Sequence, residues 1–212
     1  GNPYWTMDIG GFCVENRYAN AQRFYDRTRL ENADLREWRE LQTRWYQFGT
    51  FCPLYRAHGQ YPLREVWNIA PEDHPAYKSI VYYNRLRYKL MPYIYSLAGH
   101  AWAQSEVMMR GLVMDYTDDS IASNVSDQYM FGPSLMVCPV YEYGAESRNV
   151  YLPDGKIWYD YYNDSVYWGG QTIEADAPYE RIPLFVPSGA ILVYGKDVNY
   201  VDEQPADELT VD

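Results

Sequence analysis

The chain has 212 residues, 47% of them hydrophobic, and a formal net charge of −11 at pH 7. This length allows one large domain or two small ones, and the acidic balance argues against nucleic acid or an anionic membrane as a partner. No apolar run approaches the roughly 20 residues that a membrane-spanning helix needs, and the N-terminus does not have the pattern of a signal peptide. The chain contains 24 tyrosines, and tyrosine suits sugar-stacking clefts, wet interfaces and strands alike.

Charge divides the chain into two halves. Residues 1–107 carry 13 Arg and Lys against 11 Asp and Glu, whereas residues 108–212 carry 5 against 18. The net charge is therefore +2 in the first half and −13 in the second. We interpret this change as a domain boundary near residues 105–108, and we predict two domains, 1–107 and 108–212.

Few residues have the pattern of a metal, cofactor or disulfide site. Cys13, Cys52 and Cys138 lie at wide and irregular spacing, which matches neither a zinc pattern nor a disulfide framework, so we interpret them as small buried apolar side chains. The three histidines are too scattered for a metal site. The sequence contains no phosphate loop, dinucleotide fingerprint or nucleophile elbow. It therefore predicts no metal and no cofactor.

The first half begins with a short aromatic and apolar run, residues 3–7, which predicts a buried strand. Asp8 ends this run, and Gly10 and Gly11 predict a turn in which the backbone adopts a positive φ or approaches a ligand closely. A carboxylate at the carboxyl end of a buried strand is typical of sites in parallel α/β barrels. The alternative is an Asx turn, in which Asp8 caps nearby backbone N–H groups.

The next segments alternate between polar and amphipathic patterns. Residues 14–34 are polar and irregular, so we expect a long loop there. Apolar residues then recur at spacings of three or four over residues 35–48, which predicts an amphipathic helix. Gly49 is expected to follow this helix as its first non-helical residue. Residues 62–70 are again expected to be irregular.

A second short apolar strand is predicted at residues 50–55, and it is followed by Arg56 and His58. The strand, helix and strand together make one parallel βαβ unit, in which both polar tips lie at the same edge of the sheet. Asp8 should then face Arg56 and His58 across this rim. A lone histidine is usually structural, but a histidine opposite an aspartate at a matching strand end favours a site.

A second long helix is predicted from residue 75 to about residue 103. The sequence Asp73-His-Pro gives it a cap followed by an N-terminal proline. Pro92 lies inside this pattern, where it removes the hydrogen bond to the carbonyl of Tyr88. We therefore expect a kink at this point.

After Ser105 the pattern changes to short strands separated by glycine and proline turns. The spacing is that of a small antiparallel sandwich. We predict strands near residues 111–114, 128–131, 134–139, 148–151, 157–161, 171–175, 183–187 and 190–194. The fold class is thus α/β followed by all-β. Because two parallel strands cannot close a barrel, we expect the chain to be a piece of a larger protein.

Five segments resemble glycoside hydrolase family 31. Residues 3–12 (PYWTMDIGGF) are similar to the family's strand-seven motif, and residues 41–59 (LQTRWYQFGTFCPLYRAHG) to the following helix and strand eight. Residues 87–95 resemble the last barrel helix, and residues 127–139 and 181–191 resemble the C-terminal sandwich. The resemblance implies the last two βα units of a (β/α)8 TIM barrel followed by a C-terminal antiparallel β-sandwich.

The resemblance also implies retaining hydrolysis of an α-glycosidic bond at the non-reducing end. Within the family, the motifs are most similar in sequence to those of bacterial α-xylosidases. Retention needs two carboxyl groups about 5–5.5 Å apart. In the family both lie on earlier strands, so we expect no catalytic residue in this chain. Asp8 matches a sugar-binding aspartate, Phe12 an aromatic wall of the subsite, and His58 a histidine that binds the same sugar. Arg56 matches a supporting residue beside it.

Several alternatives stay open. The chain could instead be a non-catalytic module whose tyrosine-rich sandwich binds carbohydrate or braces the barrel, or a fragment that self-associates through open strand edges. The expected partners are an α-linked oligosaccharide and the upstream part of the same polypeptide. α-Glucosidases share most of the motifs, so the choice between xylose and glucose stays open. Localisation stays open as well, with a periplasmic or extracellular parent as one option.

Overall fold

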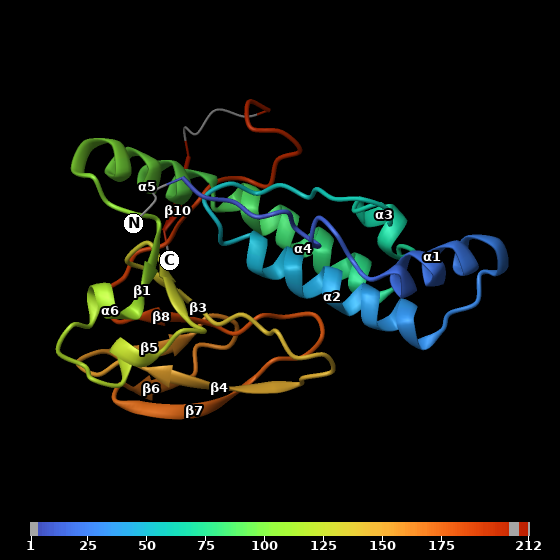
Figure 1. The fold of residues 1–212 in the computed structure, drawn as a ribbon. Helices are drawn as coiled ribbons and strands as arrows, with labels where there is room; N and C mark the ends of the chain where they lie inside the picture. The colour runs from blue at the N-terminus through green and yellow to red at the C-terminus, as the bar shows by residue number, and fades with distance from the viewer. Residues whose placement is uncertain (1–3, 204–207, 212) are drawn as a thin grey trace.

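The computed structural model describes residues 4–203 and 208–211 (Figure 1). It consists of a helical first half and a second half made mainly of antiparallel strands. None of the helices in these residues is long and apolar enough to cross a membrane. The helices are α1 Asn16–Thr28, α2 Ala33–Gly49, α3 Val66–Ile69, α4 Pro75–Lys89, α5 Met91–Gln104 and α6 Leu112–Asp115, with a 3₁₀ turn at Ala122–Asn124.

The two strands predicted in the first half are not regular strands, so this part of the prediction was wrong. Residues 5–8 have no regular structure, residues 50–54 form turns and bends, and residue 3 lies outside the described range. One isolated parallel bridge pairs Ile9 with Ala57. A lone pair of short strands is marginal, because strands need neighbours to complete their hydrogen bonding. The expected parallel approach of the two segments is nevertheless present.

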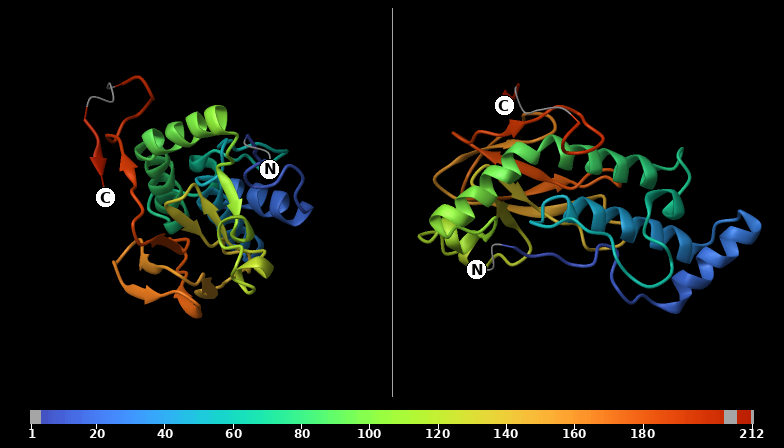
Figure 2. Two further views of the ribbon diagram at one scale, coloured as in Figure 1. Left: turned by 90° about the vertical axis from the view of Figure 1, so that its left-hand side faces the viewer. Right: turned by 90° about the horizontal axis from the view of Figure 1, so that it is seen from above.

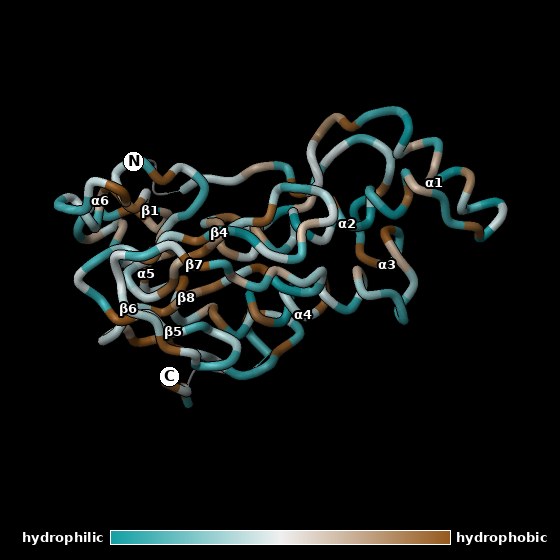
Figure 3. The backbone as a smooth tube through the Cα atoms, turned by 90° about the horizontal axis from the view of Figure 1, so that it is seen from below, coloured by the Kyte–Doolittle hydropathy of each residue, from teal (hydrophilic) through white to brown (hydrophobic). Residues whose placement is uncertain are grey.

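Helix α1 occupies a segment that we expected to be a loop. It buries Tyr18 and Ala21 against Leu35 and Trp38 of α2, and the ring centroids of Tyr18 and Trp38 lie 5.5 Å apart. Most of α1 is coloured hydrophilic or neutral in Figure 3. Its apolar face is thus narrow and interrupted by charges, which explains why the periodicity was missed.

Helix α2 was predicted correctly, although Gly49 plays a different role from the expected one. The helix begins after Asn32, whose side chain accepts a hydrogen bond from the Leu35 N–H group at 2.9 Å. Gly49 is its last helical residue and not the residue beyond it. A Cβ atom on Gly49 would lie 2.5 Å from Cδ1 of Ile9. The glycine therefore allows the segment around Ile9 to pack closely on the helix.

The second long helix is divided in two close to Pro92, where we expected a kink within one helix. The ring of His74 caps α4 by accepting a hydrogen bond from the Ala76 N–H group, and Pro75 is the first helical residue. The helix breaks at Leu90, and Pro92 lies in the first turn of α5. The segment expected to be irregular at residues 62–70 contains the short helix α3.

The second half forms a six-stranded antiparallel sheet in the order β1-β2-β3-β8-β5-β6, with a separate β4-β7 ribbon and a β9-β10 pair. Six of the eight predicted strands lie close to observed ones. The strand predicted at 111–114 is displaced because α6 follows β1 directly, and the one predicted at 190–194 is shortened to β9. β6 and β10 were not predicted. The strands are β1 Met109–Gly111, β2 Tyr129–Phe131, β3 Leu135–Val137, β4 Ser147–Leu152, β5 Ile157–Asp160, β6 Val166–Trp168, β7 Gln171–Asp176, β8 Leu184–Pro187, β9 Val193–Tyr194 and β10 Thr210–Val211.

The six-stranded sheet packs on both faces (Figures 1 and 2). Phe131, Leu135 and Leu184 belong to the core shared with α4 and α5. Met136 and Phe185 belong to a second core shared with the β4-β7 ribbon. This alternation along the strands is the two-residue period expected of a sheet that is covered on both sides.

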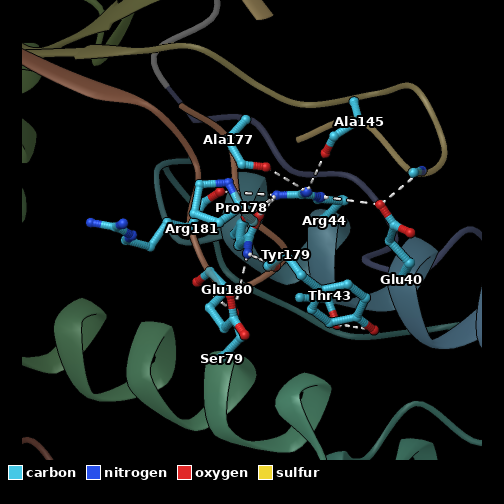
Figure 4. Close-up of polar contacts among 12 residues, drawn as sticks. Glu40, Thr43, Arg44, Ser79, Ala145, Ala177, Pro178, Tyr179, Glu180 and Arg181 are labelled. Atoms are coloured by element: carbon cyan, nitrogen blue, oxygen red, sulfur yellow. Dashed lines mark hydrogen bonds and ion pairs between the residues drawn. The ribbon is translucent and has the colours of Figure 1, made fainter. Parts of the chain in front are cut away.

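Arg44 of α2 joins the helical half to the loops of the second half (Figure 4). Its buried guanidinium donates hydrogen bonds to the carbonyl oxygens of Ala145, Ala177, Pro178 and Arg181, all at 2.9–3.0 Å. These bonds satisfy four backbone acceptors that no strand pairs in this region. The two halves are therefore joined by a directional contact as well as by apolar packing.

Candidate functional site

Two loops meet where Ile9 pairs with Ala57, and we call residues 8–12 and 56–60 the first and second rim loops. The Ile9 N–H group donates to the carbonyl of Arg56 at 3.1 Å. At the other end of the loops, the Gln60 N–H group donates to the carbonyl of Phe12 at 2.8 Å. The backbones are thus held together on both sides of the residues that the sequence analysis singled out.

Asp8 and Arg56 form an ion pair across this rim. Nη2 of Arg56 lies 2.6 Å from Oδ1 of Asp8. The arginine side chain is 57% exposed and the carboxylate 25% exposed, so solvent screens the pair. Exposed pairs of this kind contribute little to stability. The contact orients the carboxylate rather than holding the fold together.

Phe12 and His58 also meet across the rim. Their ring centroids are 5.5 Å apart, with the planes tilted by 42°. Phe12 is 45% exposed, so part of its flat apolar surface faces solvent. The structure therefore brings together all four predicted site residues, as two pairs from opposite loops.

The glycine turn after Asp8 has the predicted backbone. Gly10 and Gly11 have φ of 89° and 76°, values that suit glycine. The Gly11 N–H group donates to the backbone carbonyl of Asp8 at 2.8 Å, which closes the turn. The Asp8 carboxylate bonds to Arg56 instead, so the Asx-turn alternative is not supported.

Sequence reasoning missed two side chains that support the rim loops. Gln42 and Arg64 are both buried and both donate to carbonyl groups of the first rim loop. Gln42 lies on the predicted helix, but its position among other buried polar residues of that helix gave no signal of this contact. Arg64 lies in a segment that we expected to be irregular, where charged residues are usually solvated.

The cysteine prediction is confirmed in part. Cys52 and Cys138 are buried, and burial raises the pKa of each thiol to about 12. Cys13 is exposed, which contradicts the prediction, because it follows the rim loop at the surface. Among the described residues, no group of three His, Cys, Asp or Glu side chains is placed to hold a metal ion.

Two family models account for most of the chain. Residues 1–97 match the glycosyl hydrolases family 31 TIM-barrel domain, and residues 105–192 match the glycosyl hydrolase family 31 C-terminal domain. The chain belongs to glycoside hydrolase family 31. Its two rim loops therefore lie in the barrel part, and its antiparallel sheet lies in the C-terminal domain of the family.

The relatives of this chain include both α-xylosidases and α-glucosidases. The chain is 38% identical to the α-xylosidase of Saccharolobus solfataricus over 96% of its own length and 25% of the relative. It is 33% identical to human neutral α-glucosidase C over 77% of its length and 18% of the relative. The chain thus spans about a quarter or less of the length of these curated relatives.

Solved structures agree with this assignment. A family 31 α-xylosidase from Xanthomonas citri matches with a TM-score of 0.91 and 51% identity, covering 99% of this chain and 22% of that one. A family 31 dextranase from Flavobacterium johnsoniae, complexed with isomaltotriose, matches with a TM-score of 0.83 and 34% identity, covering 99% and 24%. The chain therefore has the fold of the corresponding part of these solved family members.

Proposed function

We propose that this chain is the C-terminal portion of a retaining, exo-acting α-glycoside hydrolase. In this proposal, residues 1–107 are the last two βα units of the barrel and residues 108–212 are a β-sandwich domain. Asp8, Phe12, Arg56 and His58 form part of the sugar-binding rim. The substrate is an α-xyloside of the xyloglucan type or an α-glucoside, and the similarity to α-xylosidases favours the first.

The observation that carries this proposal is the convergence of the four side chains at the Ile9–Ala57 bridge. A carboxylate and an imidazole can each bond to sugar hydroxyl groups, and a half-exposed ring can pack on the apolar face of a sugar. Of the two carboxylate oxygens of Asp8, only Oδ1 has a partner within the described residues, so Oδ2 can accept a hydrogen bond from a sugar hydroxyl.

The same geometry argues that Asp8 binds substrate without taking part in bond cleavage. A retaining enzyme needs a nucleophile and an acid/base carboxyl group about 5–5.5 Å apart. Asp8 instead has its Oδ1 engaged by the guanidinium of Arg56 at 2.6 Å. We propose that both catalytic carboxyl groups come from parts of the polypeptide outside residues 1–212. Those parts would then be the partner of this chain.

A bracing role for the second half is favoured by a separate observation. Arg44 and neighbouring residues of α2 and α4 bond to the loops at 144–145 and 177–181 (Figure 4). A domain fixed in this way would hold α2 in place, and α2 in turn supports the first rim loop through Gln42. This role is compatible with the enzyme proposal and does not require the sandwich to bind sugar.

The test compares the 212-residue chain with the longer enzyme that contains it, using 4-nitrophenyl α-D-xyloside and α-D-glucoside. We expect turnover by the longer enzyme alone. In that enzyme, Asp8→Ala should reduce kcat/KM by a factor on the order of 100, whereas Asp118→Ala, at an exposed acid of the second half, should have little effect. Turnover by the purified chain, or equal effects of the two substitutions, would contradict the proposal.

A further inference from the structure

Arg64 lies outside both rim loops and yet contacts each of them. Its Nη2 donates to the carbonyl of Gly11 at 2.6 Å, and its Nη1 donates to the carbonyl of Gln60 at 2.5 Å. Gly11 precedes Phe12, and Gln60 lies two residues after His58. One guanidinium therefore connects the two loops directly behind the Phe12–His58 ring pair.

The guanidinium is enclosed by protein. Arg64 is 5% exposed and its guanidinium lies 5.0 Å from the ring centre of Trp38. Burial lowers the pKa of Arg64, an effect that the nearby Tyr46 and Glu65 partly offset. A buried cation is stable only where dipoles or rings compensate for lost water, and here two carbonyl groups and an indole do so. Such an enclosed arginine is too deep to touch a bound sugar.

The surrounding backbone leaves room for this side chain. A Cβ atom on Gly59 would lie 2.6 Å from Nη2 of Arg64 and 2.6 Å from the carbonyl oxygen of Gly11. A Cβ atom on Gly10 would lie 2.9 Å from Cδ of Arg64. Gly59 therefore suits the close approach of the loops to the arginine, and Gly10 suits the close approach of both Gln42 and Arg64. The two loops and Arg64 form one fitted unit.

We propose that Arg64 is a positioning residue whose guanidinium sets the spacing of the two rim loops and, through it, the affinity of the rim for a sugar. This inference rests on the proposed function of the rim. Without the guanidinium, the carbonyl groups of Gly11 and Gln60 lose these part-buried hydrogen bonds, and the loops are free to separate or shift toward other donors. Phe12 and His58 would then no longer be held at their present distance.

The test measures xylose and glucose as competitive inhibitors of the longer enzyme that contains this chain. Arg64→Met should weaken the inhibition by a factor on the order of ten or more. The control is Arg39→Met: Arg39 is 1% exposed and lies 4.7 Å from the ring centre of Tyr25, but it contacts neither rim loop. It should lower the unfolding temperature and leave the inhibition constant within about twofold. Equal effects of the two substitutions on inhibition would overturn the proposal.

Two further measurements keep the proposal testable if Arg64→Met fails to fold, or if the rim proves to bind no sugar. Arg64→Lys keeps the charge but cannot reach both carbonyl groups, so it should weaken inhibition to an intermediate degree. In Arg64→Ala, added methylguanidine should restore inhibition.

The second measurement is amide hydrogen exchange at Gln60, whose N–H group donates to the carbonyl of Phe12. This exchange should accelerate in both variants. Unchanged exchange would overturn the positioning role. Accelerated exchange in an enzyme that binds neither sugar would instead reject the proposed function alone.

Discussion

At the scale of single residues, the rim combines a charged pair and an aromatic pair that differ in exposure and in role. The Asp8–Arg56 pair is screened by solvent and can exchange partners with a sugar hydroxyl at low cost. The Phe12–His58 pair presents two tilted rings whose position depends on the backbone behind them. Orientation of hydroxyl groups and packing against the ring are thus separable contributions.

The aromatic contribution can be measured with a matched pair of substitutions. Phe12 is 45% exposed on the rim, and Phe24 is 43% exposed on α1. We expect Phe12→Ala to weaken xylose binding in the longer enzyme by about 1 kcal/mol, the contribution typical of an aromatic contact. Phe24→Ala removes a similar exposed ring without touching the rim loops, so titration calorimetry should show unchanged affinity. Equal affinities for the two variants would mean that Phe12 does not contact the sugar.

At the scale of elements, α2 connects the rim to the second half of the molecule. Its side chain Gln42 donates to the carbonyl of Gly10 at 3.3 Å, and its side chain Arg44 binds the loops of the sheet domain. Its last residue, Gly49, packs on Ile9 of the bridge. One helix therefore fixes the first rim loop in relation to the antiparallel sheet.

Two helical glycines test this packing argument with opposite signs. A Cβ atom on Gly49 would lie 2.5 Å from Ile9, whereas one on Gly99 of α5 would meet nothing within 4 Å. We expect Gly49→Ala to destabilise the fold by about 1–3 kcal/mol through overpacking. Gly99→Ala should stabilise it by roughly 0.5–1 kcal/mol, because alanine loses less entropy in a helix. Urea unfolding measures both, and the same sign for both would contradict the argument.

Prediction from sequence succeeded where periodicity was long and turn residues were distinctive. The amphipathic pattern of α2, the break that Pro92 marks between α4 and α5, and most strands of the second half were recognised in this way. It failed for α1, whose buried face is narrow, and for the two first-half strands, which reduce to one bridge. Strand formation depends on neighbouring strands, and a local apolar run does not show whether they are present.

The same limit applies to the rim. Asp8, Arg56 and His58 could be placed together because they follow two predicted parallel strands, whose carboxyl ends share one edge. Phe12 was assigned to the site from the family resemblance. Arg64 could not be placed, because its role depends on which carbonyl groups surround it in space. Chain position gives no information about such contacts.

At the scale of the whole molecule, the chain consists of a helical part and a sheet part that pack against each other. It spans about a quarter or less of the length of these curated relatives. Helices α4 and α5 share a core with one face of the six-stranded sheet, and the β4-β7 ribbon shares a core with the other (Figure 2). The rim loops lie at the helical part, away from this sheet core. In the proposed function, this rim binds the sugar and bond cleavage takes place elsewhere in the polypeptide.

The most direct test is a crystal structure of the longer enzyme with xylose bound. We predict that xylose hydroxyl groups lie within hydrogen-bond distance of the Asp8 carboxylate and the His58 imidazole, that Phe12 packs against the sugar, and that the two carboxyl groups beside its anomeric carbon come from outside residues 1–212. A sugar bound away from Asp8, with the Asp8–Arg56 pair untouched, would contradict the account.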